Sequence, residues 1–298
     1  MAISRLGLFI FFVAFFPTSG LSKKHPRNIG NNVFTSFNEA FLPLFGNDHV
    51  IVQPDDPKSV QISLDRSSGS GFISKEFYIH GFFSASIKLP ANYTAGVVAT
   101  FYASNNIQYP DNHDEIDFEF LGNIKSKDWL LQTNVYGNGS TSKGREERYT
   151  LWFDPSQDFH TYSILWTSKS IIFYVDDVPI RETQRVEAMG GDYPAKPMSL
   201  FATIWDGSDW ATSGGKYKVD YNFSPFVARY SDLELVGCTI DPTQKQPKCN
   251  FPVEQFAGLT KTDKTVMKNH RTKYMIYSYC YDKSRYPVPL PECVPWQW

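Results

Sequence analysis

The sequence predicts an all-β fold, a β-sandwich of two packed antiparallel sheets followed by a short C-terminal extension. From about residue 33 to residue 237 the chain is a succession of short apolar or alternating runs, with turn residues between them. No segment of helical spacing interrupts this succession. After residue 238 the pattern changes, and all four cysteines fall in this last part of the chain.

The predicted strands are rich in Val, Ile, Tyr and Phe, and Gly, Pro, Asn and Asp separate them. Because no helices alternate with these strands, antiparallel sheets packed face to face account best for the pattern. We therefore assign residues 33–237 to one sandwich domain. The clearest runs are residues 59–64, 82–89, 96–103, 129–136, 162–166, 171–180 and 198–205.

Residues 238–298 form the predicted extension. A link rich in Pro and Lys leads to a polar stretch near residues 263–275 with helical spacing, and then to an aromatic segment. None of the cysteines has the CxxC spacing of a zinc or redox site, so disulfides are the better interpretation. Four cysteines allow three pairings. The two short separations favour Cys238 with Cys249 and Cys280 with Cys293.

The N-terminus has the pattern of a secretory signal peptide, assigned to residues 1–20. Arg5 precedes an apolar run over residues 6–16, which is too short to span a membrane, since a spanning helix needs about 20 residues. No later apolar run has membrane length, so we expect a secreted, extracellular protein. Three glycosylation sequons are compatible with this, although a proline follows the third; they begin at Asn92, Asn138 and Asn222.

The charge and aromatic content indicate a neutral ligand. The formal net charge is −2, which does not favour nucleic acid or an acidic membrane as partner. Aromatic residues make up 16% of the chain, and Tyr and Trp side chains can stack on ring-shaped ligands.

The segment HDEIDFEFLG, residues 113–122, is the main candidate for chemistry. Side chains alternate between the two faces of a strand, so Glu115, Asp117 and Glu119 share one face and apolar residues share the other. Repulsion between like charges raises the pKa of the acid that is least hydrated, so that one acid stays protonated while another ionises. A retaining glycosidase needs such a pair.

This acidic face has two other possible interpretations. Charged residues are mostly exposed, so a solvated strand face is the general alternative, but like charges on one strand face are destabilising and the apolar opposite face indicates a central strand. Metal binding is a second alternative, which the absence of His or Asn among the acids disfavours. The neighbouring His113 and Asp114 are harder to assign, and a structural role is favoured for His113.

The segment HDEIDFEFLGN resembles the signature of plant xyloglucan endotransglucosylase/hydrolases in glycoside hydrolase family 16. Further segments resemble the family in order along nearly the whole mature chain, among them GSGFISK, LQTNVYGNG, GREER, LWFDP, KPMSLFATIWDGSDWATSGGK and the Cys-rich end. The resemblance implies a jelly-roll sandwich with an open cleft on its concave face, and neither metal nor organic cofactor in the chemistry. Residues 190–192 and the loop after them resemble the transglucosylase-type members of the family's third group.

The resemblance also assigns roles to individual residues. It places Glu115 at the nucleophile position, Glu119 at the acid/base position and Asp117 at the helper position between them. The substrate contacts that it implies are Gln132, Thr133, Asn134, Arg145, Glu146, Trp205, Asp209, Trp210, Gly214 and Arg285, with Arg285 reaching the acceptor side. Many members of the family carry a sequon soon after the catalytic strand, whereas here the nearest one begins at Asn138.

The expected function is that of a monomeric xyloglucan transglucosylase of the plant cell wall and apoplast. It would cleave the β-1,4-glucan backbone of xyloglucan and join it to a polysaccharide or oligosaccharide acceptor. Two alternatives remain open from the sequence: a hydrolase of xyloglucan or a related glucan, and a noncatalytic glycan-binding module. The intact acid trio argues against the module, because binding alone does not require it.

Overall fold

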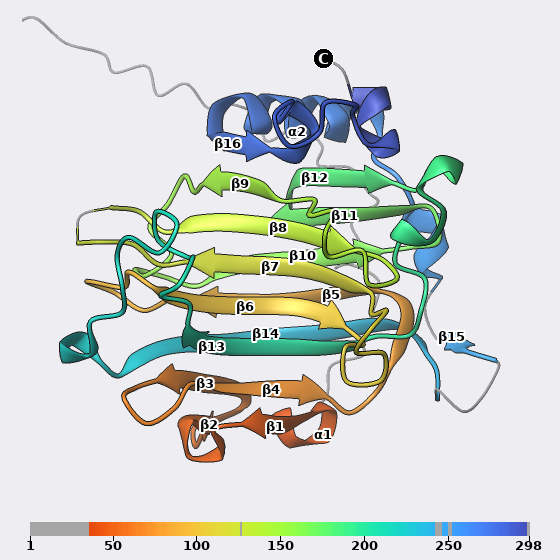
Figure 1. The fold of residues 1–298 in the computed structure, drawn as a ribbon. Coiled ribbons are helices and arrows are strands. Elements are labelled where there is room, and N and C mark those ends of the chain that lie inside the picture. Colours follow the sequence, from red (N-terminus) through yellow and green to blue (C-terminus); the bar gives the residue numbers. More distant parts are fainter. Residues whose placement is uncertain (1–35, 126, 242–245, 250–251, 297–298) are drawn as a thin grey trace, which may run out of the picture.

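The structure is a computed structural model in which residues 36–125, 127–241, 246–249 and 252–296 are described. The predicted signal peptide lies outside these residues. Figure 1 shows two layers of strands, with the C-terminal helix across one edge. The predicted sandwich of two antiparallel sheets is therefore confirmed.

The first sheet carries the predicted acidic strand, β7, at its centre, and its neighbouring strands pair antiparallel. Its strands in spatial order are β1 (Phe41–Phe45), β4 (Ser70–Ser74), β13 (Ser199–Asp206), β6 (Val97–Ser104), β7 (Glu115–Leu121), β8 (Leu130–Tyr136), β9 (Glu147–Thr150) and β16 (Met275–Ser278).

The second sheet lies behind the first in the view of Figure 1. In spatial order it contains β12 (Val178–Gln184), β11 (Ser170–Val175), β10 (His160–Trp166), β5 (Tyr78–Lys88), β14 (Phe226–Thr239), β3 (Asp56–Leu64) and β2 (Val50–Gln53), and the short β15 (Lys248–Cys249) pairs with β14. The helical segments are α1 (Phe37–Ala40), η2 (Asn47–His49), η3 (Glu187–Asp192), η4 (Tyr221–Phe223), η5 (Val253–Phe256), α2 (Lys261–Tyr274), η6 (Tyr279–Tyr281) and η7 (Pro291–Trp296).

The apolar face of β7 fixes the acidic strand against the core between the sheets. Phe118 and Phe120 both contact the ring of Tyr162 on β10, with ring centroids 5.7 and 4.6 Å apart, and Phe118 also meets Phe173 edge to face. Such edge-to-face pairs add to the stabilisation from burial. Since the inner face of β7 is buried in this way, its acidic side chains face away from the second sheet.

The sequence interpretation of residues 171–180 as one strand is wrong. The structure divides this segment into β11 and β12, which form a hairpin. Asp176 and Asp177 at the turn have φ angles of 46° and 63°. A tight hairpin turn with two positive φ angles matches the right-handed twist of the strands, and Asp tolerates this backbone region.

The C-terminal extension contributes to the sandwich itself. The predicted helix is present as α2, which begins with a capping box formed by Thr260 and Asp263. After it, β16 pairs with β9 and so extends the first sheet by one strand. The disulfides are Cys238 with Cys249, which ties β15 to β14, and Cys280 with Cys293.

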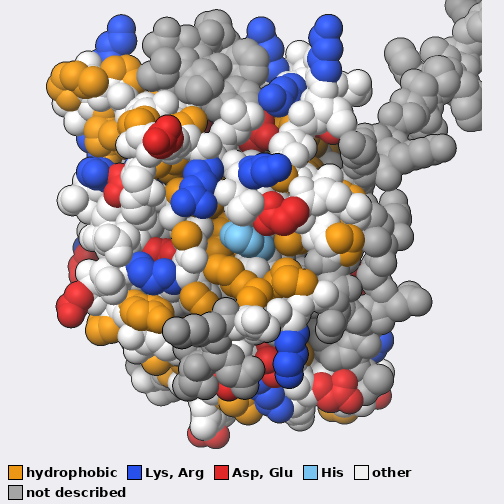
Figure 2. Space-filling model, turned by 90° about the vertical axis from the view of Figure 1, so that its right-hand side faces the viewer, with side chains coloured by type: hydrophobic (Ala, Val, Ile, Leu, Met, Phe, Trp, Pro, Cys, Tyr) orange, Lys and Arg blue, Asp and Glu red, His pale blue; other side chains and the backbone are white. Residues whose placement is uncertain are grey.

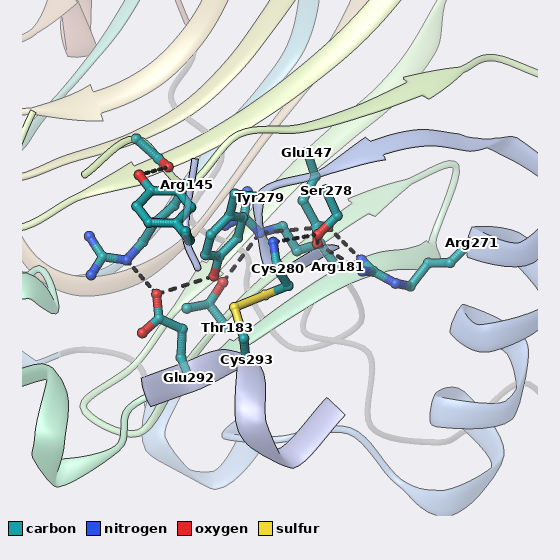
Figure 3. Close-up of a disulfide and its surroundings, with 12 residues drawn as sticks. Arg145, Glu147, Arg181, Thr183, Arg271, Ser278, Tyr279, Cys280, Glu292 and Cys293 are labelled. Atoms are coloured by element: carbon teal, nitrogen blue, oxygen red, sulfur yellow. Dashed lines mark hydrogen bonds and ion pairs between the residues drawn. A yellow bond between two sulfur atoms is a disulfide. The ribbon is translucent and has the colours of Figure 1, made fainter. Parts of the chain in front are cut away.

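A network of buried charges joins the extension to the sandwich, as Figure 3 shows. Glu147 on β9 accepts two hydrogen bonds from the Arg271 guanidinium of α2, at 2.5 and 2.7 Å, and a third from Ser278 at 2.9 Å. Beside the Cys280–Cys293 disulfide, Glu292 accepts hydrogen bonds from Arg145 and Tyr279. The extension is therefore anchored by paired charges as well as by apolar contacts.

The surface shown in Figure 2, the right-hand side of Figure 1, has basic, acidic and hydrophobic side chains interspersed. This agrees with the nearly balanced net charge. Among the described residues, no helix has the length and apolar character needed to cross a membrane.

Candidate active site

The register of the first sheet places a polar residue beside each acid of β7. Glu115 lies opposite Ser104 and Tyr136, Asp117 opposite Tyr102 and Asn134, and Glu119 opposite Thr100 and Gln132. Side chains directly opposite each other in antiparallel strands point to the same face. The outer face of three adjacent strands therefore forms one polar surface with the acids along its middle.

This surface is the floor of a cleft of about 600 Å³. The walls come from both sides of the acidic strand. Trp205 on β13 and Trp210 in the following loop lie on one side, with ring centroids 6.1 Å apart, and Glu146 and Arg148 lie on the other. The lining residues are Thr100, Tyr102, Asn106, Glu115, Asp117, Phe118, Glu119, Gln132, Asn134, Tyr136, Glu146, Arg148, Thr203, Trp205 and Trp210.

A chain of hydrogen bonds fixes the side chain of Glu119. Gln132 donates from its amide nitrogen to the Glu119 carboxylate at 2.6 Å, and its carbonyl oxygen accepts from Nε of Arg148 at 2.7 Å. Because Arg148 is a donor only, it sets the orientation of the Gln132 amide. The Glu119 carboxyl group is thereby held in the cleft by the neighbouring strands.

Burial and mutual repulsion raise the pKa values of the acids. Burial, opposed by the hydrogen bond from Gln132 and reinforced by the charge of Glu115, raises the pKa of Glu119 to about 7. Burial and the charges of both glutamates raise the pKa of Asp117 well above its usual range. Near neutral pH, Glu119 can therefore both hold and release a proton.

Glu115 has partners that favour its ionised form. Burial raises its pKa, but a hydrogen bond from Ser104 and the charge of His113 oppose this effect. These two partners limit the rise in the pKa of Glu115 that burial causes. The environments of Glu115 and Glu119 thus differ, although the two residues lie on one strand.

Replacement of Glu119 by Gln is expected to stabilise the protein at alkaline pH. The folded pKa of Glu119 lies above its usual value of 4.5, so its favourable contribution is complete below about pH 4.5 and is lost as the pH rises through about 7. Gln cannot ionise, and the gain at pH 8 should be on the order of 1–3 kcal/mol. Denaturant unfolding at pH 5 and pH 8 measures it.

Asp209→Asn is the matched control, because the Asp209 carboxylate is fully exposed and should contribute little at either pH. If Glu119→Gln and the unchanged protein lost stability equally between pH 5 and pH 8, the raised pKa of Glu119 would be contradicted.

Eight of the thirteen predicted site residues line the cleft, namely the three acids together with Gln132, Asn134, Glu146, Trp205 and Trp210. Two others are excluded from it. Thr133 points into the core, where its hydroxyl and carbonyl oxygens accept hydrogen bonds from Arg181 at 2.9 and 3.0 Å. Arg145 is also fully buried and binds Glu292 and Asp192. The predicted substrate contacts by the side chains of Thr133 and Arg145 are therefore wrong, because alternation along β8 and into β9 turns them inward.

Three further predicted contacts lie outside the lining of the cleft. Asp209 and Gly214 are exposed in the loop after β13, and the Asp209 carboxylate lies 3.6 Å from the Lys218 ammonium group. Arg285 of the extension forms an ion pair of 2.6 Å with Glu146, which does line the cleft. Arg285 thus reaches the cleft through Glu146.

Sequence reasoning missed Arg148, Ser104 and Tyr102. Arg148 belongs to the quoted GREER segment, and period-2 alternation from Glu146 places it on the cleft face. Ser104 and Tyr102 lie on β6, whose pairing with β7 was not deducible from the chain order alone. Asp114 is a structural residue, because its buried carboxylate accepts hydrogen bonds from the backbone of Asn138, Ala195 and Lys196.

In the described part of the chain, no group of His, Cys, Asp or Glu side chains has the arrangement of a metal site.

Solved structures share this fold. The chain superimposes on a β-glucanase of Bacillus licheniformis with a TM-score of 0.54 and 24% identity, covering 69% of this chain and 94% of the glucanase. A Crh5 transglycosylase in complex with NAG gives the same TM-score at 22% identity, covering 69% of this chain and 85% of the other. At these identities the likeness establishes the sandwich fold.

The sequence relationships are more specific. The family model for glycosyl hydrolases family 16 matches residues 37–223, and the model for the xyloglucan endo-transglycosylase C-terminus matches residues 244–293. Probable xyloglucan endotransglucosylase/hydrolase protein 28 of Arabidopsis thaliana is 58% identical, covering 87% of this chain and 79% of the relative. Xyloglucan endotransglucosylase/hydrolase protein 2 of the same plant is 44% identical, covering 86% and 88%. The chain belongs to glycosyl hydrolases family 16 and, within it, to the xyloglucan endotransglucosylase/hydrolases.

Proposed function

We propose that this protein is a retaining enzyme that cleaves the β-1,4-glucan backbone of xyloglucan and transfers the fragment to another xyloglucan chain or oligosaccharide. The observation that supports this most strongly is the pair of differently stabilised glutamates on β7, in a cleft with two indole rings. The names of the plant relatives supply the substrate. Action in the plant cell wall after secretion is part of the proposal.

In the first step, a carboxylate oxygen of Glu115 attacks the anomeric carbon of the sugar at the cleavage point. The bond from this carbon to the leaving oxygen breaks, and the proton of Glu119 passes to that oxygen. The pKa of Glu119, raised to about 7, supplies a protonated acid under mildly acidic conditions. The product is a covalent ester between the donor fragment and Glu115.

In the second step, the 4-hydroxyl oxygen of an acceptor chain attacks the same carbon and displaces Glu115. Glu119, now ionised, takes the proton of this hydroxyl group. Asp117 lies between the two glutamates, and the rise in its pKa, caused by burial and by both glutamate charges, opposes a third negative charge on this strand face. Both reacting glutamates return to their initial protonation states.

The remaining cleft residues are proposed to bind the sugar chain. Trp205 and Trp210 offer flat apolar faces for pyranose rings, and Gln132 and Asn134 offer amide groups for hydroxyls. Glu146, paired with Arg285, is assigned to the acceptor side. Asp209 and Gly214 stay predicted contacts of an incoming polysaccharide.

The main alternative is that water completes the reaction, which would make the protein a xyloglucan hydrolase. Both outcomes share the covalent intermediate and differ only in the second nucleophile. A cleft that extends past the acids to Glu146 and Arg148 provides polar groups for an acceptor sugar, which favours transfer.

Incubation of the secreted protein with xyloglucan and a fluorescent xyloglucan oligosaccharide tests the proposal. Label incorporated into polymer is the expected result. A loss of viscosity without incorporation would identify a hydrolase, and retention of xyloglucan without either change would leave only a binding protein. Cellulose oligosaccharides without xylosyl branches serve as the control acceptor.

A further inference from the structure

A second groove of about 250 Å³ lies at the end of the second sheet, outside the cleft already described. It is formed between the connection from β5 to β6 and the first residues of β14. Its lining includes Asn92, Phe223 and Pro225. Two of the three sequons of the chain, beginning at Asn92 and Asn222, therefore meet at this groove.

The two asparagines differ in their surroundings. Asn92 is exposed, has a φ of 71° and makes no side-chain hydrogen bond to the part of the chain that the structure describes. Asn222 accepts a hydrogen bond from Arg66 at 3.2 Å, and Pro225 directly follows its sequon. The amide of Asn92 is thus free to carry a substituent, whereas the side-chain oxygen of Asn222 is held by Arg66 and a proline follows its sequon.

An aromatic side chain borders the groove beside Asn92. The ring of Phe223 is 48% exposed, and Tyr93 stacks against it with centroids 5.3 Å apart and an interplanar angle of 22°. Tyr93 is held by its hydroxyl, which donates to the carbonyl of Lys218. Asp220 caps the short helix η4 that carries Phe223. An exposed ring held in place in this way costs hydration free energy unless something covers it.

We propose that Asn92 carries an N-linked glycan and that its first N-acetylglucosamine lies in this groove against the ring of Phe223. The apolar face of a pyranose ring matches an aromatic side chain, and its polar substituents can face Lys88 and Arg229, which also line the groove. Asn92 and Phe223 belong to the same chain, so the glycan attached to Asn92 would cover the ring of Phe223 as the protein folds.

The attachment step requires a polyprenyl diphosphate-linked oligosaccharide as donor. The bond from the sugar C1 to the diphosphate breaks, a bond from C1 to the Asn92 side-chain nitrogen forms, and the amide releases a proton. The Thr94 hydroxyl that the sequon needs is buried, where it accepts a hydrogen bond from the backbone of Asn123 at 3.0 Å. Attachment must therefore precede closure of this loop.

Expression in a eukaryotic secretory host, followed by glycopeptide mapping and thermal unfolding, tests the inference. Asn92→Gln is expected to remove one glycan and to lower Tm by about 2–4 °C, the shift typical for about 1 kcal/mol in a domain of this size. Phe223→Ser should lower the Tm of the glycosylated protein by a similar amount. In a protein that already carries Asn92→Gln, it should lower Tm hardly at all. Trimming with endoglycosidase H, which leaves one N-acetylglucosamine, should preserve Tm.

Phe159→Ser is the matched control, because Phe159 is also exposed but does not line this groove. Its effect on Tm should be the same with and without the glycan. An unmodified Asn92 in the secreted protein would overturn the inference. Additive effects of Asn92→Gln and Phe223→Ser would overturn the placement of the sugar against Phe223. Neither result bears on transfer activity, so the proposed function is tested separately.

Discussion

Replacement of Glu115 by Ala is expected to lower turnover of xyloglucan by about 10⁴-fold or more, because no other group can form the covalent intermediate. The fold should persist, since the side chain faces the cleft while Ile116 and Phe118 hold the strand in the core. Binding of xyloglucan should also persist. Initial rates with the natural polymer and unfolding curves of both proteins measure these effects.

The product formed with azide separates the roles of the two glutamates. The activated donor is a β-configured xyloglucan oligosaccharyl fluoride or aryl glycoside. In Glu115→Ala, azide can occupy the space left by the carboxylate and displace the leaving group in a single inverting step, which gives an α-glycosyl azide. In Glu119→Ala, Glu115 still forms the ester, and azide attack on it gives the β product. If Glu115→Ala gave the β-azide and Glu119→Ala the α-azide, the roles of nucleophile and acid/base would be reversed.

The acidic strand was predictable because one rule, the alternation of side chains along a strand, determines its two faces. It placed Glu115, Asp117 and Glu119 together, and the structure confirms that they share a cleft. Family resemblance does not determine which face of a strand a matched residue occupies. Alternation places Thr133 and Arg145 inward, whereas their neighbours Gln132, Asn134 and Glu146 occupy the cleft face.

Other features depend on which strands pair and in what register. That Ser104 of β6 faces Glu115 follows from strand pairing, which the sequence pattern leaves undetermined. The pairing of β16 with β9 was equally undetermined, because residues 275–278 have no strong strand signal and follow a helix directly. The pKa differences among the acids arise from burial and from these neighbours, so they too required the assembled fold.

The second large effect is expected at the contact between the extension and β9. Burial alone would raise the pKa of Glu147, but the charges of Arg271 and Arg181 outweigh it and lower the pKa to about 2. Arg271→Ala removes two hydrogen bonds from a buried carboxylate, and such a loss typically costs 3–5 kcal/mol. We expect the free energy of unfolding at pH 7 to fall by about this amount.

The pH dependence distinguishes a lost ion pair from lost packing. Because the folded pKa of Glu147 is lowered, its contribution is present above about pH 4.5 and disappears as the pH falls toward about 2. The difference between Arg271→Ala and the unchanged protein should therefore shrink at pH 3. Lys261→Ala on the exposed start of α2 is the control and should change stability by less than about 0.5 kcal/mol. A loss that is the same at both pH values would attribute the effect to packing.

The same substitution should alter the reaction as well as the stability. Glu147 lies between Glu146 and Arg148, whose side chains line the side of the cleft proposed for the acceptor, and Arg148 orients Gln132 toward Glu119. When Glu147 loses its partner in α2, β9 loses the anchor that holds these groups. Transfer needs a bound acceptor and hydrolysis does not, so the ratio of transfer to hydrolysis should fall in Arg271→Ala and stay unchanged in Lys261→Ala. An unchanged ratio in a folded Arg271→Ala protein would limit the extension to a stabilising role.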